Sequence, residues 1–231
     1  MSESFILIEE NCVLKLTMNA PSNNLMTADF FRGYEEVMAE VEAMAQTGSI
    51  KGMVICGGGR HFSTGADVEA LAQRSADESY DDATGELPAG HIRQKHFFTF
   101  LRGLPFPVVS AVTGFCIGSG SEIAVNSHYR IIEKNARVGQ PESTFGILPA
   151  LGGVARTIDI CGMQNAYELV MSGELIPAER AYEIGWADIF TEKKQSLPEA
   201  LSLIKYIAER GDFTPERAKA IMRDYKEVRQ V

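Results

Sequence analysis

The sequence has few cysteines, little positive charge and no long hydrophobic run. Its 231 residues contain four cysteines, none of them in a C-x-x-C pair: Cys12, Cys56, Cys116 and Cys161. Disulfide frameworks and zinc ribbons need more closely spaced cysteines, so the sequence fits neither class. We therefore expect four reduced thiols in the core of a cytoplasmic protein.

Positive charge is scarce because 22 Lys and Arg face 31 Asp and Glu, a net charge of −9. Nucleic acids and anionic membranes are bound by clusters of Lys and Arg, so we expect neither as a partner and no basic patch. The N-terminus, "MSESFILIEEN", lacks the basic region of a signal peptide. No apolar stretch approaches the roughly 18 residues of a membrane-spanning helix.

The chain does have an ordinary soluble composition, 45% hydrophobic and 23% charged, which allows a sizeable core. Apolar runs that end in glycine, such as "KGMVICGGG" (51–59) and "PFPVVSAVTGFCIG" (105–118), predict buried strands. Between them lie helical patterns, and the last third is helical, so the order predicts an α/β fold. Residues 73–90 are acidic and rich in turn formers, and predict a surface loop. Helices are expected from Thr27, near Ala66 and over 91–103, 152–161, 163–172, 177–184, 198–210 and 214–228.

The first stretch with chemical potential is "GGGRHFSTGADVEAL" (57–71). A strand ends, the chain turns at Gly65, and Ala66 and Asp67 open a helix. Amides at a helix start lack partners and can donate to an anion or a developing oxyanion. Gly65 lets a ligand approach the backbone, whereas Asp67 alone is typical of a residue that complements the helix dipole.

The second stretch is "FCIGSGSEIAVNSHYR" (115–130). Gly118, Ser119 and Gly120 again end a strand and start a helix, so Ser119 and Gly120 can offer amides in the same way. Glu122 lies in the first turn of that helix. On its own it would complement the helix dipole.

The third stretch is "VGQPESTFGILPALGG" (138–153), where Glu142 follows a proline in a segment without helical periodicity. Glu142 could be a turn residue that caps a helix from Ser143. If Glu122 and Glu142 met beside the two amide donors, they could hold a water and transfer protons.

Other motifs are missing from the chain. "GSGSEI" lacks the third glycine of a dinucleotide fingerprint, "GGGRHFSTG" has no G-K-[ST], and there is no G-x-S-x-G elbow. His91 and His96 are five residues apart, which is wrong for a metal pair, and we expect no metal. His61 is expected to be a partly buried turn residue rather than a base.

Four spaced motifs resemble the enoyl-CoA hydratase/isomerase (crotonase) superfamily over about residues 4–190. They are "HFSTGADVEAL", "LPFPVVSAVTGFCIGSGSEIAVNSHYRI", "VGQPESTFGILPALGGVARTIDICG" and "SGELIPAERAYEIGWAD". The resemblance implies a crotonase-like spiral of ββα units over 1–194. It also implies a shortened helical C-terminal region over 195–231, which in the family serves oligomerisation and covers the CoA.

The resemblance also implies roles for individual residues. The two oxyanion-hole amides fall on Ala66 and Ser119, and the catalytic glutamates on Glu122, as base toward water, and Glu142, as acid toward Cα. Substrate and CoA binding falls on Arg60, Gly65, Asp67, Gly118 and Gly120. The family usually has glycine where Ser119 stands, and a second cation after the A-D turn is absent.

The expected function is hydration of a 2-enoyl-CoA, or the reverse dehydration, in acyl-CoA and fatty-acid metabolism. No cofactor is expected besides the coenzyme A of the substrate, and the family implies a homotrimer or a hexamer. Isomerisation, dienoyl-CoA hydration, hydrolysis and decarboxylation remain alternatives, because each begins from the same polarised thioester. A non-catalytic acyl-CoA-binding subunit is a further alternative, whereas RNA binding fits poorly with the charge.

Overall fold

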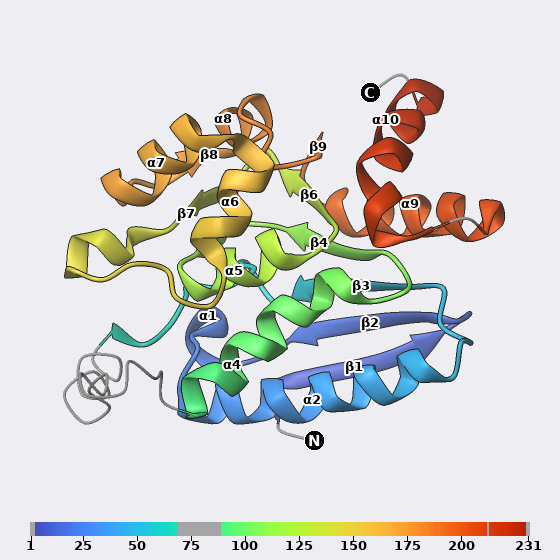
Figure 1. The fold of residues 1–231 in the computed structure, drawn as a ribbon, viewed down its shortest axis with the longest axis horizontal. Coiled ribbons are helices and arrows are strands. Elements are labelled where there is room, and N and C mark those ends of the chain that lie inside the picture. The colour runs from blue at the N-terminus through green and yellow to red at the C-terminus, as the bar shows by residue number, and fades with distance from the viewer. Residues whose placement is uncertain (1–2, 69–88, 212, 230–231) are drawn as a thin grey trace.

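Six strands form the larger of two sheets, in the order β1-β2-β3-β4-β6-β9 (Figure 1). The computed structural model describes residues 3–68, 89–211 and 213–229. β1 and β2 are antiparallel, and each later pair of neighbours is parallel. The six strands are β1 (Phe5–Glu10), β2 (Val13–Met18), β3 (Gly52–Gly57), β4 (Val108–Val112), β6 (Tyr129–Glu133) and β9 (Ile189–Thr191).

The smaller sheet consists of β5 (Phe115–Ile117), β7 (Arg137–Gly139) and β8 (Ile176–Pro177). The sequence predicted one strand over 105–118, and that prediction is wrong. Gly114, at φ +57, turns the chain, so β5 leaves the main sheet and pairs with β7. Only glycine fits there, because a Cβ would lie 2.2 Å from the carbonyl oxygen of Arg60.

The helices agree closely with the predicted ranges. The long helix from Thr27 is α2, and the Thr27 hydroxyl caps it by accepting the Phe30 N–H. The helix expected near Ala66 and the loop over 73–90 lie largely outside the described residues. The elements are α1 (Pro21–Asn24), α2 (Ala28–Gln46), α4 (Ala89–Thr99), η1 (Phe100–Gly103), α5 (Ser119–Asn126), η2 (Pro141–Phe145), α6 (Gly153–Cys161), α7 (Met163–Ser172), α8 (Ala178–Glu183), α9 (Ser196–Arg210), η3 (Pro215–Arg217) and α10 (Ala218–Arg229).

The main sheet has a core on each face, which explains its nearly continuous apolar strands. In β3, Met53 and Ile55 pack in the core that includes α2 and α5. Their neighbours Val54 and Cys56 point the other way, into a core with α9 and α10. The predicted division at residue 195 stays a prediction, and α9 packs directly on β3, β4 and β6.

Three of the four cysteines are buried and unbonded, as predicted, whereas Cys12 is exposed. Cys12 lies in the β1–β2 turn at φ +62, so its side chain is directed by the turn and not by a strand. Among the described residues, no helix has the length and apolarity to cross a bilayer. Within the same ranges, no three His, Cys, Asp or Glu side chains cluster as metal ligands would.

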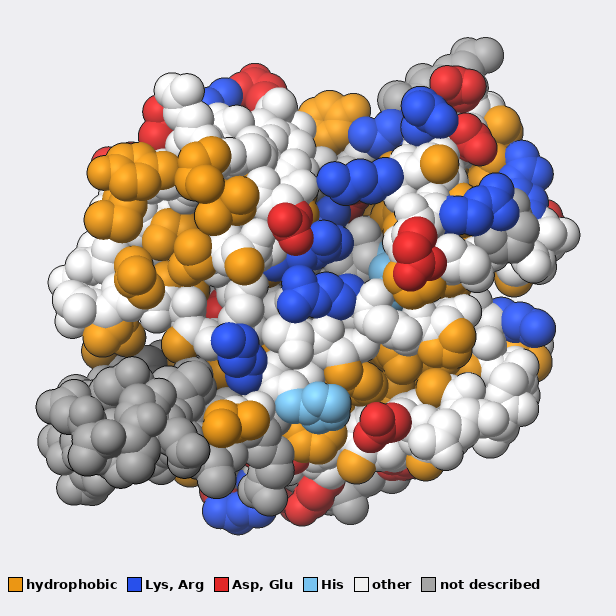
Figure 2. Space-filling view, viewed as in Figure 1, with side chains coloured by type: hydrophobic (Ala, Val, Ile, Leu, Met, Phe, Trp, Pro, Cys, Tyr) orange, Lys and Arg blue, Asp and Glu red, His pale blue; other side chains and the backbone are white. Residues whose placement is uncertain are grey.

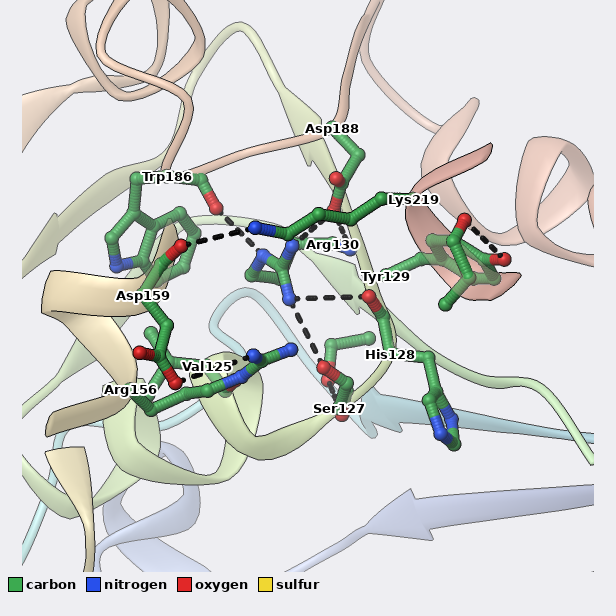
Figure 3. Close-up of polar contacts among 12 residues, drawn as sticks. Val125, Ser127, His128, Tyr129, Arg130, Arg156, Asp159, Trp186, Asp188 and Lys219 are labelled. Atoms are coloured by element: carbon green, nitrogen blue, oxygen red, sulfur yellow. Dashed lines mark hydrogen bonds and ion pairs between the residues drawn. The ribbon is translucent and has the colours of Figure 1, made fainter. Parts of the chain in front are cut away.

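A buried arginine on β6 fastens the sheet to the later part of the chain (Figure 3). The Arg130 side chain is 3% exposed and pairs with Asp188. Its Nε donates to the Trp186 carbonyl at 2.7 Å and its Nη1 to the Ser127 carbonyl at 3.0 Å. The buried charge is therefore met by a carboxylate and by carbonyl oxygens.

More cations gather around Arg130. Arg156 on α6 donates to the Val125 carbonyl at 2.9 Å, and Lys219 donates to the Asp159 carbonyl at 3.3 Å (Figure 3). Burial, with the charges of Arg130 and Arg102, lowers the pKa of Arg156 to about 10. Figure 2 shows Lys and Arg side chains gathered over this part of the surface. The sequence did not reveal this cluster of cations, because its members come from separate segments of the chain.

We expect Arg130→Gln to lower the free energy of unfolding by about 3–5 kcal/mol, since it leaves Asp188 without its cation. Urea denaturation measures this. Arg32→Gln is the matched control, because the Arg32 pair with Asp29 is 70% and 80% exposed and should contribute little. Equal losses in the two variants would contradict the assignment of Arg130 as an anchor.

Candidate active site

Two glycine turns lie against each other at one edge of the main sheet. Parallel neighbours β3 and β4 bring their carboxyl ends to the same edge, and each is followed by one of the turns. Gly65 has φ +85, and a Cβ there would lie 2.8 Å from the carbonyl oxygen of Ile117. It would also lie 3.7 Å from the Cα of Gly118, so turn 65–66 touches turn 117–119.

The amide of Ala66 is directed away from its neighbours on the chain. Met26 N–H donates to the Gly65 carbonyl at 2.8 Å, and Asp67 N–H donates to the Met26 carbonyl at 3.2 Å. These bonds lie on either side of Ala66, and Ala66 pairs with Met26 as an isolated parallel bridge. The N–H of Ala66 finds no acceptor in the described part of the chain.

The amide of Ser119 opens α5. Gly118 N–H donates to the Gly139 carbonyl at 2.9 Å, which ends the strand pairing. Ser119 follows as the first helical residue, where the N–H has no carbonyl four residues earlier to bond. In the described ranges the Ser119 N–H has no acceptor. Each of the two turns therefore presents one backbone N–H that is available to a ligand.

The remaining glycine of this turn has a packing role. A Cβ at Gly120 would lie 2.7 Å from the Cβ of Ser63, so glycine lets α5 lie directly on the strand segment that precedes Gly65. The Ser119 side chain is nearly buried at 8% exposure. The side chain at position 119 does not remove the backbone N–H of Ser119, so the donor that faces the turn is still present.

Glu122 is a buried carboxyl at 2% exposure. Its Oε1 accepts the N–H of Leu151 at 2.7 Å and the N–H of Gly153 at 2.9 Å. Gly153 must lack a side chain, because a Cβ there would lie 2.8 Å from this oxygen. The start of α6 therefore packs directly against Glu122, and its N–H groups set the direction of the carboxyl group.

Glu142 lies beside the start of α5. A Cβ at Gly118 would be 3.2 Å from Glu142 Oε1, and the buried Oε2 has no hydrogen-bond partner in the described chain. Burial raises the pKa of Glu142. Burial, and then the charge of Glu142, raises the pKa of Glu122, against the Gly153 and Leu151 amides and the charge of Lys95. Ionisation of Glu142 therefore disfavours ionisation of Glu122, and the state with both carboxyls ionised is destabilised.

Further polar groups near these carboxyls were missed by sequence reasoning. Gln140 is fully buried, both atoms of its amide lack partners in the described residues, and its Nε2 lies 2.7 Å from the Cβ position of Gly153. Asn126, one helical turn after Glu122, donates to the carbonyls of Glu122 and Leu151 at 2.9 and 3.3 Å. The four-residue spacing of Glu122 and Asn126 was the only signal, and nothing local marked Gln140.

The other predicted residues lie at the rim. Arg60 is exposed and has no ion-pair partner among the described residues, and Asp67 is partly buried at the end of the turn. His61 stacks on Phe115, and its Nδ1 accepts the Phe115 N–H at 2.8 Å. Burial lowers the pKa of His61, so it stays a neutral turn residue, as expected. The geometry offers two amide donors and two coupled carboxyls, an arrangement suited to polarising a carbonyl and moving protons.

Comparisons with known proteins fit this arrangement. A model of the family described as enoyl-CoA hydratase/isomerase matches residues 8–230. The 2,3-dehydroadipyl-CoA hydratase of Escherichia coli K12 is 32% identical over 99% of this chain and 84% of that protein. The fatty acid oxidation complex subunit alpha of Pseudomonas savastanoi pv. phaseolicola is 31% identical over 84% of this chain, but only 25% of that subunit is matched.

Solved structures share the fold. An enoyl-CoA hydratase from Bacillus anthracis superimposes with a TM-score of 0.77 at 20% identity, over 99% of this chain and 84% of that chain. Pseudomonas aeruginosa DspI superimposes with a TM-score of 0.75 at 23% identity, over 98% of this chain and 87% of that chain. At these identities the likeness shows the fold alone.

The raised pKa of Glu122 predicts a pH-dependent stability. Because the folded-state pKa lies above the unfolded one, the protonated carboxyl stabilises the folded state at low pH. That contribution is lost as the pH rises through the folded-state pKa. Glu122→Gln has no such titration, so its free energy of unfolding relative to the native protein should increase as the pH rises above the ordinary glutamic acid pKa. Urea denaturation from pH 4 to pH 9 measures the difference, and a constant difference would contradict the prediction.

Proposed function

Because this chain belongs to the enoyl-CoA hydratase/isomerase family, we propose that it adds water across the double bond of a 2-enoyl-CoA, or removes it in reverse. The family and the crotonase-like α/β fold predicted from the sequence are confirmed. The chain is an enzyme of enoyl-CoA hydratase/isomerase type, which agrees with an acyl-CoA substrate. The observation that carries the hydratase proposal is the pair of coupled carboxyls beside two unpartnered amides.

The amides polarise the thioester. In this proposal the carbonyl oxygen of the substrate accepts from the N–H groups of Ala66 and Ser119. As water adds at Cβ, electron density moves from the double bond onto this oxygen and forms an enolate. Donors already in place stabilise the enolate more than the neutral carbonyl, and one such donor contributes about 100- to 1000-fold in rate.

The glutamates handle the water. Burial raises the pKa of Glu122, and the two amide N–H groups on its Oε1 oppose that rise and stabilise the carboxylate. We assign Glu122 as the base that takes a proton from water. The buried Oε2 of Glu142 has no hydrogen-bond partner in the described residues, so we assign Glu142 as the acid that protonates Cα. The oxygen of water bonds to Cβ, one proton goes to Cα, and the proton taken by Glu122 restores Glu142 for the next turnover.

Two further parts of the proposal concern binding and assembly. Coenzyme A arrives as part of the substrate, and we assign Arg60, which is exposed and precedes the first turn, to its phosphates. A homotrimer or hexamer is supported by apolar side chains that gather on the surface over α7 and η2 (Figure 2). These residues are Phe145, Ile147, Leu148, Met163, Tyr167, Met171 and Leu175.

The hydratase proposal is tested with a panel of 2-enoyl-, dienoyl- and 3-hydroxyacyl-CoA thioesters, with products followed by mass. We expect one product to gain the mass of water. Glu122→Gln and Glu142→Gln should each lower kcat by about 100- to 10,000-fold, because each removes one proton-transfer group. A double-bond shift without mass change, or release of free coenzyme A, would replace the reaction with isomerisation or hydrolysis. Tight binding without turnover would favour a binding subunit.

The contact between α6 and Glu122 gives a second test. Gly153→Ala places a Cβ 2.8 Å from Glu122 Oε1 and 2.7 Å from Gln140 Nε2, so it should displace the carboxyl and lower kcat at least about 10-fold. Gly103→Ala is the matched control, because a Cβ there meets nothing within 4 Å. If both variants kept native kcat, the carboxyl of Glu122 would not need its present position.

A further inference from the structure

A buried asparagine outside the predicted site connects two loops. Asn24 is 3% exposed and ends α1. Its Oδ1 accepts the Ala20 N–H at 2.9 Å, and its Nδ2 donates to the carbonyls of His61 and Phe62, each at 3.1 Å. The bond from Ala20 closes the loop before α2, and the other two bonds join that loop to the segment that leads into Gly65.

The backbone of Asn24 continues the connection. Ser63, which is fully buried, donates its hydroxyl to the Asn24 carbonyl at 2.7 Å. The same hydroxyl oxygen accepts the Gly65 N–H at 3.1 Å. The peptide between Thr64 and Gly65, next to the one that carries the Ala66 N–H, is therefore connected through Ser63 to Asn24.

Two residues later the same loop pairs with Ala66 itself. Met26 accepts from Asp67 and donates to Gly65, which leaves only the Ala66 N–H to point outward. The direction of that N–H depends on where Met26 lies, and Met26 follows Asn24 closely along the chain. Asn24 holds both sides of this arrangement, the loop that carries Met26 and the segment that carries Ala66.

We propose that Asn24 is a positioning residue that sets the direction of the Ala66 amide N–H. The inference rests on the proposed function, because it assigns Ala66 as an oxyanion donor. Asn24 touches no reacting atom in this proposal. It acts through Ser63, Gly65 and Met26, and its loss should weaken the polarisation of the thioester more than the binding of coenzyme A.

The backbone of this loop supplies a matched pair of variants. Asn23 and Asn24 both have left-handed backbone, at φ +65 and +61, which glycine adopts without strain. Asn24→Gly therefore removes the three side-chain bonds while it relieves the backbone. Asn23→Gly relieves the same kind of backbone, but the Asn23 side chain is exposed and makes no hydrogen bond among the described residues.

The experiment compares both variants with the native protein. Asn24→Gly should lower kcat by about 10- to 100-fold with KM changed less than about 3-fold, because a displaced donor loses part of its effect on the transition state. Asn23→Gly should keep native kcat. A second variant, Asn24→Ser, keeps a short polar side chain, and its kcat should lie between those of Asn24→Gly and Asn23→Gly. It tests the inference if the glycine variant folds poorly.

Infrared spectra of a bound acyl-CoA separate positioning from a loss of folding. Two amide donors should lower the stretching frequency of the thioester carbonyl in the native protein and in Asn23→Gly, and less so in Asn24→Gly. This readout uses a saturated acyl-CoA, so it holds even if the native protein hydrates nothing and the proposed function fails. Equal frequencies and equal kcat in the native protein and Asn24→Gly would overturn the inference. So would a native protein that leaves the carbonyl frequency at its value in water.

Discussion

The burial of one carboxyl group constrains the rest of the site. An ionisable side chain with 2% exposure destabilises a fold unless donors meet it. Glu122 meets this condition through the amides of Leu151 and Gly153, and both need the chain to arrive at the start of α6 in one orientation. Asn126 strengthens the same junction from α5 by donating to the Leu151 carbonyl. The positions of α5 and α6 relative to each other thus follow from what a buried carboxyl needs.

The two amide-bearing turns are related by backbone hydrogen bonds, not by side chains. Ser63 N–H donates to the Phe115 carbonyl at 2.9 Å, and Ile117 N–H donates to the Ser63 carbonyl at 3.1 Å. This short parallel ladder ends two residues before Gly65 and one before Gly118. Because ladder geometry is nearly invariant, the spacing between the two turns is insensitive to rotamers. In the role proposed for Asn24, its side chain then sets only the direction of the Ala66 N–H.

Local pattern was enough to predict the buried strands, the helices and the turns that carry Glu122 and Glu142. The rest depended on contacts that no local pattern encodes. The amides that hold Glu122 come from residues 29 and 31 positions later, and Asn24 reaches carbonyls 37 and 38 positions away. The strand break at Gly114 follows from the close approach of residue 60, and the cations around Arg130 assemble only in three dimensions. The sequence therefore predicted the elements of the site and missed the groups that orient them.

Helix α5 connects the cations around Arg130, at its C-terminal end, with the Ser119 amide at its N-terminal end. Its eight residues are too few for a stable isolated helix, and all of them are buried, so packing holds it in place. At its C-terminal end, Arg156 and Arg130 donate to the carbonyls of Val125 and Ser127, where cations complement the negative end of the helix dipole. At the N-terminal end, no carboxyl of the described residues accepts from the Ser119 amide, because the carboxyl of Glu122 is directed to α6. In the proposed function the positive end of the helix therefore faces the oxyanion of the substrate. The hydrogen bonds of Arg130 and Arg156 at the other end help to hold the helix in this position.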